Sequence, residues 1–142
     1  MAESRSHFVE RFGEVRRRVA GVIDEAYAPL GIGSTQAKLL RAIGAGSKTS
    51  QAELARTTGT DPAALGRALR TLLDRGLVRR RRSREDRRAF ALELTPEGDA
   101  LLQQVVAARA VLLARVEDSL DARDRAAFER IAVKLLAAFP AR

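Results

Sequence analysis

The sequence predicts a mainly α-helical chain of six helices and one small β-hairpin. Three observations lead to this fold class. Apolar residues recur at steps of three and four along most of the chain, as they do on the buried face of a helix. Proline and glycine punctuate these segments where helices should begin and end. Alternation with a period of two appears within residues 77–95, around a charged segment, and indicates two short strands.

The composition of the chain limits the classes of function that it could have. The 142 residues carry a formal net charge of +8 and a sequence pI near 11.2, which favours a polyanionic partner. There is no cysteine, which excludes disulfides and thiol chemistry, and with His7 as the single histidine no metal site is expected. The N-terminus lacks the apolar core of a signal peptide and no segment should span a membrane, so a cytoplasmic protein is expected.

The first helix is expected from about residue 5 to residue 28, where Pro29 stops it. A second helix should run to Ile43, with Ser34 as its N-cap. The expected inward side of the first helix is apolar at steps of three and four: Phe8, Phe12, Val15, Val19, Val22, Ile23 and Ala26.

Two short helices separated by a glycine follow. Ser50 and Glu53 have the spacing of a capping box, which predicts a third helix over 51–57. Gly59 supplies the backbone freedom of a tight turn. Asp61 followed by proline then starts a fourth helix that should continue to about residue 75. Its expected buried stripe is Leu65, Ala68, Leu69, Leu72 and Leu73.

The remaining elements are a hairpin and two helices. Strands are expected at 77–82 and 89–95. A long helix should start at Pro96, and Asp121 should cap a final helix. The first and last helices carry more apolar surface than the central residues can cover. They are therefore expected to pack against each other and against a second copy of the chain.

The pair of helices around Gly59 has the features of a helix-turn-helix. In that motif the second helix lies in the major groove of DNA and the first braces it across the backbone. The exposed side of the fourth helix has small residues in its first turn, followed by Arg67 and Arg70. Arginine can pair with both acceptors on a guanine edge, so these two side chains are candidates for reading bases.

The segment after this helix is strongly basic. Residues 77–90 hold seven arginines against only Glu85 and Asp86. The tip between the strands carries Arg84, Arg87 and Arg88, which suits insertion into the negative potential of a narrow minor groove. Asp86 is interpreted as a structural acid that ties a neighbouring arginine. The alternative is a solvated charge run that blocks edge-to-edge aggregation, and it accounts poorly for seven arginines.

At this point the chain resembles the MarR family of winged helix-turn-helix transcriptional regulators. The resemblance lies in the order helix-turn-helix, GLVRR at 76–80, and REDRRAFALELTPEG at 84–98. The D-x-R-x₅-L-T pattern typical of the family's wing is present at Asp86, Arg88, Leu94 and Thr95. The resemblance implies an N-terminal dimerisation helix in 1–33, a winged helix-turn-helix DNA-binding domain in 34–95, and C-terminal dimerisation helices in 96–142.

The resemblance also implies a function: a homodimeric regulator, expected to be a repressor, that binds a pseudo-palindromic site in double-stranded DNA. Half-sites should lie about 10–10.5 bp apart. By the same resemblance Ala63, Ala64, Arg67 and Arg70 would face bases, Arg88 would enter the minor groove, and Ser50 with Arg84 would hold phosphates. A small-molecule effector is possible, in a crevice lined by Phe12, Arg16, Tyr27 and Gln36. Phe12 and Tyr27 are better explained as core residues.

Three rival functions stay open. A non-specific nucleoid or architectural protein would share the basic surface but bind all duplexes alike. An enzyme is disfavoured, because the adjacent acids Glu85 with Asp86 and Asp24 with Glu25 point in different directions or lie on an exposed loop. No catalytic residue and no cofactor is expected. A winged-helix module that binds only proteins would show no affinity for any duplex.

Overall fold

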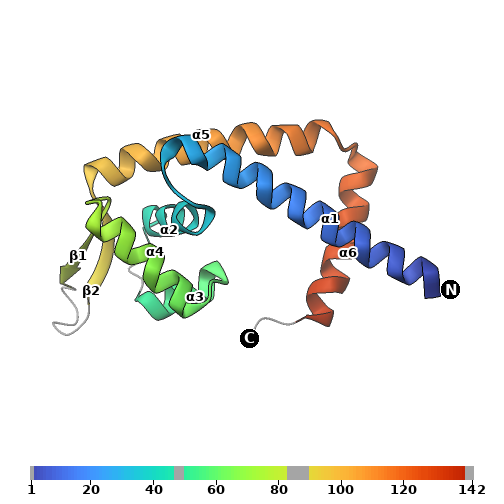
Figure 1. Cartoon of the computed structure of the whole chain (residues 1–142), viewed down its shortest axis with the longest axis horizontal. Coiled ribbons are helices and arrows are strands. Elements are labelled where there is room, and N and C mark those ends of the chain that lie inside the picture. The colour runs from blue at the N-terminus through green and yellow to red at the C-terminus, as the bar shows by residue number, and fades with distance from the viewer. Residues whose placement is uncertain (1, 47–49, 83–89, 140–142) are drawn as a thin grey trace. The chain divides into compact units, whose positions relative to one another are not determined.

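The computed structural model describes residues 2–46, 50–82 and 90–139, with side chains described from residue 7 onward (Figure 1). Within these ranges the mainly helical class with one antiparallel hairpin is confirmed. By internal contacts the chain divides into two compact units, residues 1–109 and 110–142. The elements are α1 Ala2–Tyr27, the short 3-10 helix η1 Ala28–Leu30, α2 Ser34–Gly44, α3 Gln51–Thr58, α4 Pro62–Asp74, β1 Val78–Arg82, β2 Phe90–Leu94, α5 Pro96–Asp118 and α6 Ala122–Ala138.

The hydrophobic core lies in the first unit. Its buried residues run from Tyr27 at the end of α1 to Val105 in α5. Leu39 and Leu40 of α2, Leu54 of α3, and two leucines of α4 have no exposed surface. The helices of the helix-turn-helix and the start of α5 therefore share one core, and α4 is fixed by its apolar face.

The helix-turn-helix forms as its start and stop signals predict. The Ser50 hydroxyl accepts a hydrogen bond from the Glu53 amide at 3.2 Å, and the Glu53 carboxylate accepts from the Ser50 amide at 3.1 Å. Gly59 has φ of 60°, a left-handed conformation that favours glycine, and it ends α3. Asp61 caps α4 by accepting from the Ala64 amide at 3.0 Å. These contacts fix the turn between the two helices.

The hairpin is held to the core by its base. Val78 pairs with Leu94, so the register places Arg79 opposite Glu93. At the end of β2 the Thr95 hydroxyl donates to the Gly76 carbonyl at 2.6 Å and accepts from the Gly98 amide at 3.1 Å. A Cβ on Gly98 would lie 1.9 Å from the Leu77 carbonyl oxygen, so only glycine permits this approach of α5 to the hairpin.

The second unit contains the end of α5 and all of α6. Asp121 caps α6 by accepting from the Asp124 amide at 2.8 Å, which confirms the expected start of the last helix. No residue of this unit is buried within the described range. Its exposed large apolar side chains are Val111, Leu113, Val116, Leu120, Phe128, Ile131, Val133, Leu136 and Phe139. This unit therefore has apolar surface without a core of its own.

One detail differs from the expectations. Ser34 is not the N-cap of the second helix. It is the first helical residue, and Gly33 is the N-cap, with its amide donating to the Gln36 side chain at 3.2 Å. Leu101 and Val105 in the first half of α5 belong to the same core as α2 and α4, so the first unit extends to residue 109.

Candidate nucleic-acid interface

Helix α4 presents a basic side to solvent. Arg67 and Arg70 are exposed, whereas Leu65, Ala68, Leu69 and Leu72 on the opposite side are buried. The two arginines lie three residues apart and therefore share a face. The helix is anchored by its apolar stripe while its guanidinium groups extend outward, which is the arrangement that groove reading requires.

The first turn of α4 and the start of α3 carry the other predicted contacts outside the hairpin. Ala63 is exposed, and Ala64 is half-buried with its amide occupied by Asp61. Ser50 is exposed at the N-terminus of α3, where its hydroxyl is engaged in the capping box. Helix N-termini attract phosphate because their amides and dipole are positive. Ser50 therefore lies where a phosphate contact is feasible, with a structural role in addition.

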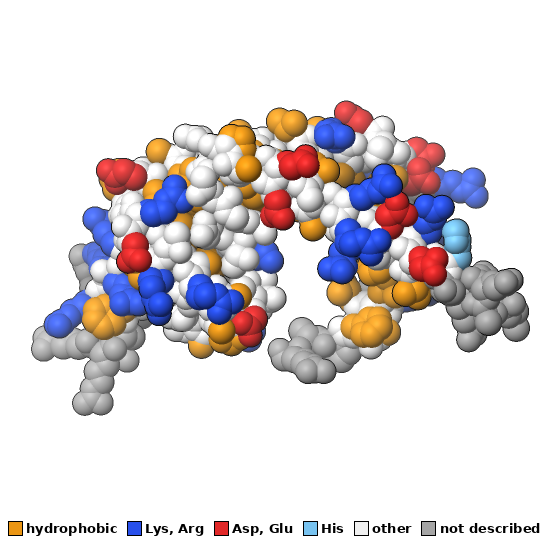
Figure 2. Space-filling model, in the orientation of Figure 1, with side chains coloured by type: hydrophobic (Ala, Val, Ile, Leu, Met, Phe, Trp, Pro, Cys, Tyr) orange, Lys and Arg blue, Asp and Glu red, His pale blue; other side chains and the backbone are white. Residues whose placement is uncertain are grey.

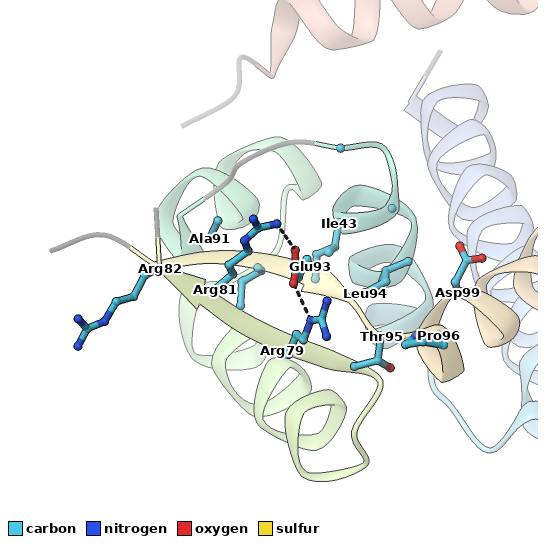
Figure 3. Close-up of a pocket in the computed structure, with 13 residues that line it drawn as sticks. Ile43, Arg79, Arg81, Arg82, Ala91, Glu93, Leu94, Thr95, Pro96 and Asp99 are labelled. Atoms are coloured by element: carbon cyan, nitrogen blue, oxygen red, sulfur yellow. Dashed lines mark hydrogen bonds and ion pairs between the residues drawn. The ribbon is translucent and has the colours of Figure 1, made fainter. Parts of the chain in front are cut away.

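Strand β1 carries four consecutive arginines, Arg79 to Arg82, and these divide into two pairs. Glu93 lies between Arg79 and Arg81: its carboxylate is 2.5 Å from the Arg79 Nε and 3.5 Å from an Arg81 terminal nitrogen (Figure 3). The hydrogen bond from Arg79 holds the pKa of Glu93 below its usual value, and the charge of Arg81 adds to the shift. One carboxylate thus partly neutralises two of the four cations.

Arg80 and Arg82 form the other pair. Strand alternation places them on the face opposite Arg79 and Arg81, and both are exposed. In Figure 3 the Arg82 side chain points away from Glu93. Among the ion pairs of the described residues, Glu93 is bonded to neither. Arg80 and Arg82 are thus more available to an external anion, and Figure 2 shows basic side chains gathered over this part of the molecule.

The arginine run in the sequence predicts DNA contacts only at its tip and does not distinguish these strand residues from one another. The register of the hairpin separates the two pairs of arginines, because it places Glu93 directly opposite Arg79. The predicted tip contacts Arg84, Arg87 and Arg88, and the structural acid Asp86, lie outside the described residues.

The four predicted effector residues do not meet within one chain. Tyr27 is a core residue with 6% of its surface exposed, and Gln36 caps the second helix. Phe12 is 53% exposed, and Arg16 is also exposed. Fifteen residues of α1 separate Phe12 from Tyr27, which is about 22 Å at the rise of an α-helix. A single chain therefore cannot form one small pocket from all four.

The described residues of the first unit line a larger and a smaller open pocket. The larger, about 780 Å³, lies beside the face of the hairpin that carries Glu93, and the end of α2 and the start of α5 form its other walls (Figure 3). The smaller, about 280 Å³, is lined by residues from α1, α2 and α4, including Gln36 and Arg67. Of the predicted effector residues, Gln36 alone lines either pocket. In the described ranges no cluster of three metal-ligating side chains occurs, and no helix is apolar and long enough to cross a membrane.

Comparison with known proteins agrees with this geometry. Residues 30–89 match the model of the MarR family. The multiple antibiotic resistance protein MarR of Salmonella typhimurium is 31% identical over 90 residues, which cover 63% of this chain and 62% of that protein. The match thus spans less than two thirds of the curated relative.

Solved structures extend the match over nearly the whole chain. A mutant MarR from E. coli, solved in complex with operator DNA, is 26% identical and covers 89% of this chain and 91% of that chain, with a TM-score of 0.78. A MarR family protein of Mycobacterium tuberculosis, solved with salicylic acid, is 32% identical and covers 92% and 94%, with a TM-score of 0.67. The expected six helices and two-stranded sheet are the winged-helix fold of these proteins, and the chain belongs to the MarR family.

Proposed function

We propose that the protein is a sequence-specific double-stranded DNA-binding transcriptional regulator, acting as a repressor without enzymatic activity. One observation carries the proposal: α4 is anchored in the core by one face while Arg67 and Arg70 extend from the other. The E. coli relative bound to operator DNA supports it. A regulator of this kind acts in the cytoplasm, where it meets the chromosome.

The proposed active form is a homodimer. Helix α1 exposes Phe8, Phe12 and Val15, and α6 exposes Phe128 and Ile131. Exposed apolar side chains on a helix, as on each of these two, are typical of protein interfaces. A two-fold dimer would present two α4 helices to successive major grooves, so its site should be pseudo-palindromic with half-sites about 10–10.5 bp apart.

The contacts divide by role. Arg67 and Arg70 read bases, with Ala63 and Ala64 allowing close approach of the helix. Arg88 enters the minor groove. The phosphate contacts come from Ser50, Arg84 and Arg87. The exposed strand arginines Arg80 and Arg82 are added, on the ground that among the described residues Glu93 pairs with Arg79 and Arg81 and not with them.

Selection of bound sequences from a random DNA pool, followed by competition with unselected duplexes, tests the proposal. Arg67→Ala should relax the preference at one base position, at a cost of roughly 1–3 kcal/mol against the preferred base. Arg17→Ala, which removes an exposed arginine of α1, is the matched control. Equal affinity of the wild type for selected and random DNA would favour an architectural protein instead, and no affinity for any duplex would favour a protein-binding module.

The wing is tested separately. Arg88→Ala should weaken operator binding several-fold and leave the dimer intact, because its proposed contact is with DNA alone. The affinity of the wild type should also fall steeply with salt, by roughly 10³–10⁵ between 50 and 200 mM for six to ten phosphate contacts. Gel shifts across a salt series and sedimentation of the variant measure both effects. Wild-type affinity in the Arg88 variant would contradict the assigned role of the wing.

We further propose that a small-molecule effector relieves binding. The M. tuberculosis relative was solved with salicylic acid, so an aromatic carboxylate is the first ligand class to test. Since Phe12 and Tyr27 lie far apart on one α1, a pocket that uses Phe12, Arg16, Tyr27 and Gln36 would need the second copy. Titration of the protein–operator complex with salicylate should then release DNA. Arg16→Ala should weaken that release, and unchanged release would contradict the assignment of Arg16.

A further inference from the structure

One long-range hydrogen bond joins the end of the proposed recognition helix to the end of α1. The Arg75 guanidinium donates to the Gly31 carbonyl at 2.7 Å, across 44 residues of sequence. Arg75 is the residue that ends α4, and Gly31 is the residue that ends the turn of η1 after α1. Resting on the proposed function, we infer that Arg75 is a positioning residue that sets the spacing at which the dimer reads its two half-sites.

The surroundings of Arg75 suit a cation. Helix C-termini carry a partial negative charge on their free carbonyl groups. Arg75 is the C-cap residue of α4, and its guanidinium donates to a carbonyl at the C-terminal end of η1. The positive group therefore interacts favourably with the end of η1 and joins it to the residue that ends α4.

Both ends of this link have fixed backbone geometry. Gly31 has φ of 68°, and its amide donates to the Ala28 carbonyl at 3.0 Å. On the other side Gly76 has φ of 66°, and two hydrogen bonds close the end of α4: Gly76 to Leu73 at 3.0 Å and Leu77 to Leu72 at 2.9 Å. Neither end can turn freely, so the hydrogen bond constrains the two helices and not merely a loop.

The length of α1 makes this constraint matter. Phe12, one of its exposed apolar residues, lies about 22 Å from Tyr27 at the C-terminal end of the helix. If α1 carries the dimer contact, a tilt of about 5° between α1 and α4 would displace one recognition helix by roughly 2 Å relative to the two-fold axis. Hydrogen bonds to base edges tolerate only a few tenths of an ångström. The apolar contacts by which α2 joins α1 and α4 are non-directional, whereas the hydrogen bond of Arg75 has a preferred direction.

The experiment compares duplexes that carry the selected half-sites at increasing centre-to-centre spacing with a duplex that carries a single half-site. Wild-type protein should prefer one spacing. Arg75→Met, which keeps the apolar stem but removes the donors, should keep its affinity for the single half-site and lose about three- to tenfold in preference for the correct spacing over its neighbours. Arg75→Lys keeps a cation and should recover part of the preference. This variant provides the test if the methionine variant folds poorly.

Arg17→Met is the matched control, since Arg17 is an exposed arginine of the same unit without a role in this link. A spacing profile of Arg75→Met equal to that of the wild type would overturn the inference, as would an equal loss at every spacing and at the single half-site. These results differ from failure of the proposed function, in which the wild type itself would show no sequence preference or no binding.

Discussion

The two units of the chain use apolar residues in different ways. In residues 1–109 they build a closed core, in which Leu39, Leu54 and Leu65 have no exposed surface. In residues 110–139 none is buried, although Phe128 is 62% and Phe139 is 76% exposed. A unit with a core is able to hold its own fold, whereas a pair of helices without one needs another surface to cover it. The first unit is therefore able to hold its side chains in fixed positions, and the second is suited to association with another surface.

A core substitution should produce the largest effect and should act on the first unit. Leu65 is fully buried in α4, so Leu65→Ala removes apolar contacts and leaves a cavity. We expect a loss of about 2–5 kcal/mol in the free energy of unfolding, measured by urea denaturation. Leu136→Ala, at a site 70% exposed in α6, is the matched control and should cost much less in a monomeric sample. Equal losses at the two sites would contradict the division between units.

This division could be anticipated from the sequence only in part. The capping signals at Ser50 and Asp61 and the stripe of α4 act locally, so they predicted the helix-turn-helix and the exposure of Arg67. Which apolar helices share a core is a matter of tertiary packing. The periodicity of the helix after Pro96 looks alike along its length, and only the structure distinguishes its buried first half.

The candidate site shows the same limit. The hydrogen bond from Arg75 to Gly31 joins residues 44 positions apart, and no local sequence pattern predicts it. The ion pairs of Glu93 depend on the register of the two strands. A shift of one residue in that register would move the Glu93 side chain to the other face of the hairpin. The capping role of Gln36, whose side chain accepts a hydrogen bond from the Gly33 amide, is also absent from the sequence prediction, because glycine offers no capping side chain that would mark the start of the helix.

The next largest effect should appear in association. Phe128→Asp places a charge on the exposed apolar face of α6 and should weaken the proposed dimer by about thirtyfold, equivalent to about 2 kcal/mol. Sedimentation over a range of protein concentrations measures this, with Glu129→Gln on the same helix as the control. Near-UV circular dichroism should stay unchanged, since Tyr27 lies in the core of the first unit. A dimer of undiminished affinity would show that the face of α6 around Phe128 is not the interface.

The smallest effect should come from the surface of the first unit, at Glu93. Its lowered pKa means that the charged carboxylate is more stable in the folded state than in the unfolded chain. Its contribution to stability is therefore present at pH values above the unfolded pKa, near 4.5, and is lost as pH falls through the lowered folded pKa. Glu93→Gln removes this contribution, so the difference in Tm between wild type and variant should be present at neutral pH and should shrink as the pH falls below 4.5. A difference that persists at low pH would mean that Glu93 acts through packing and not through its charge on Arg79 and Arg81.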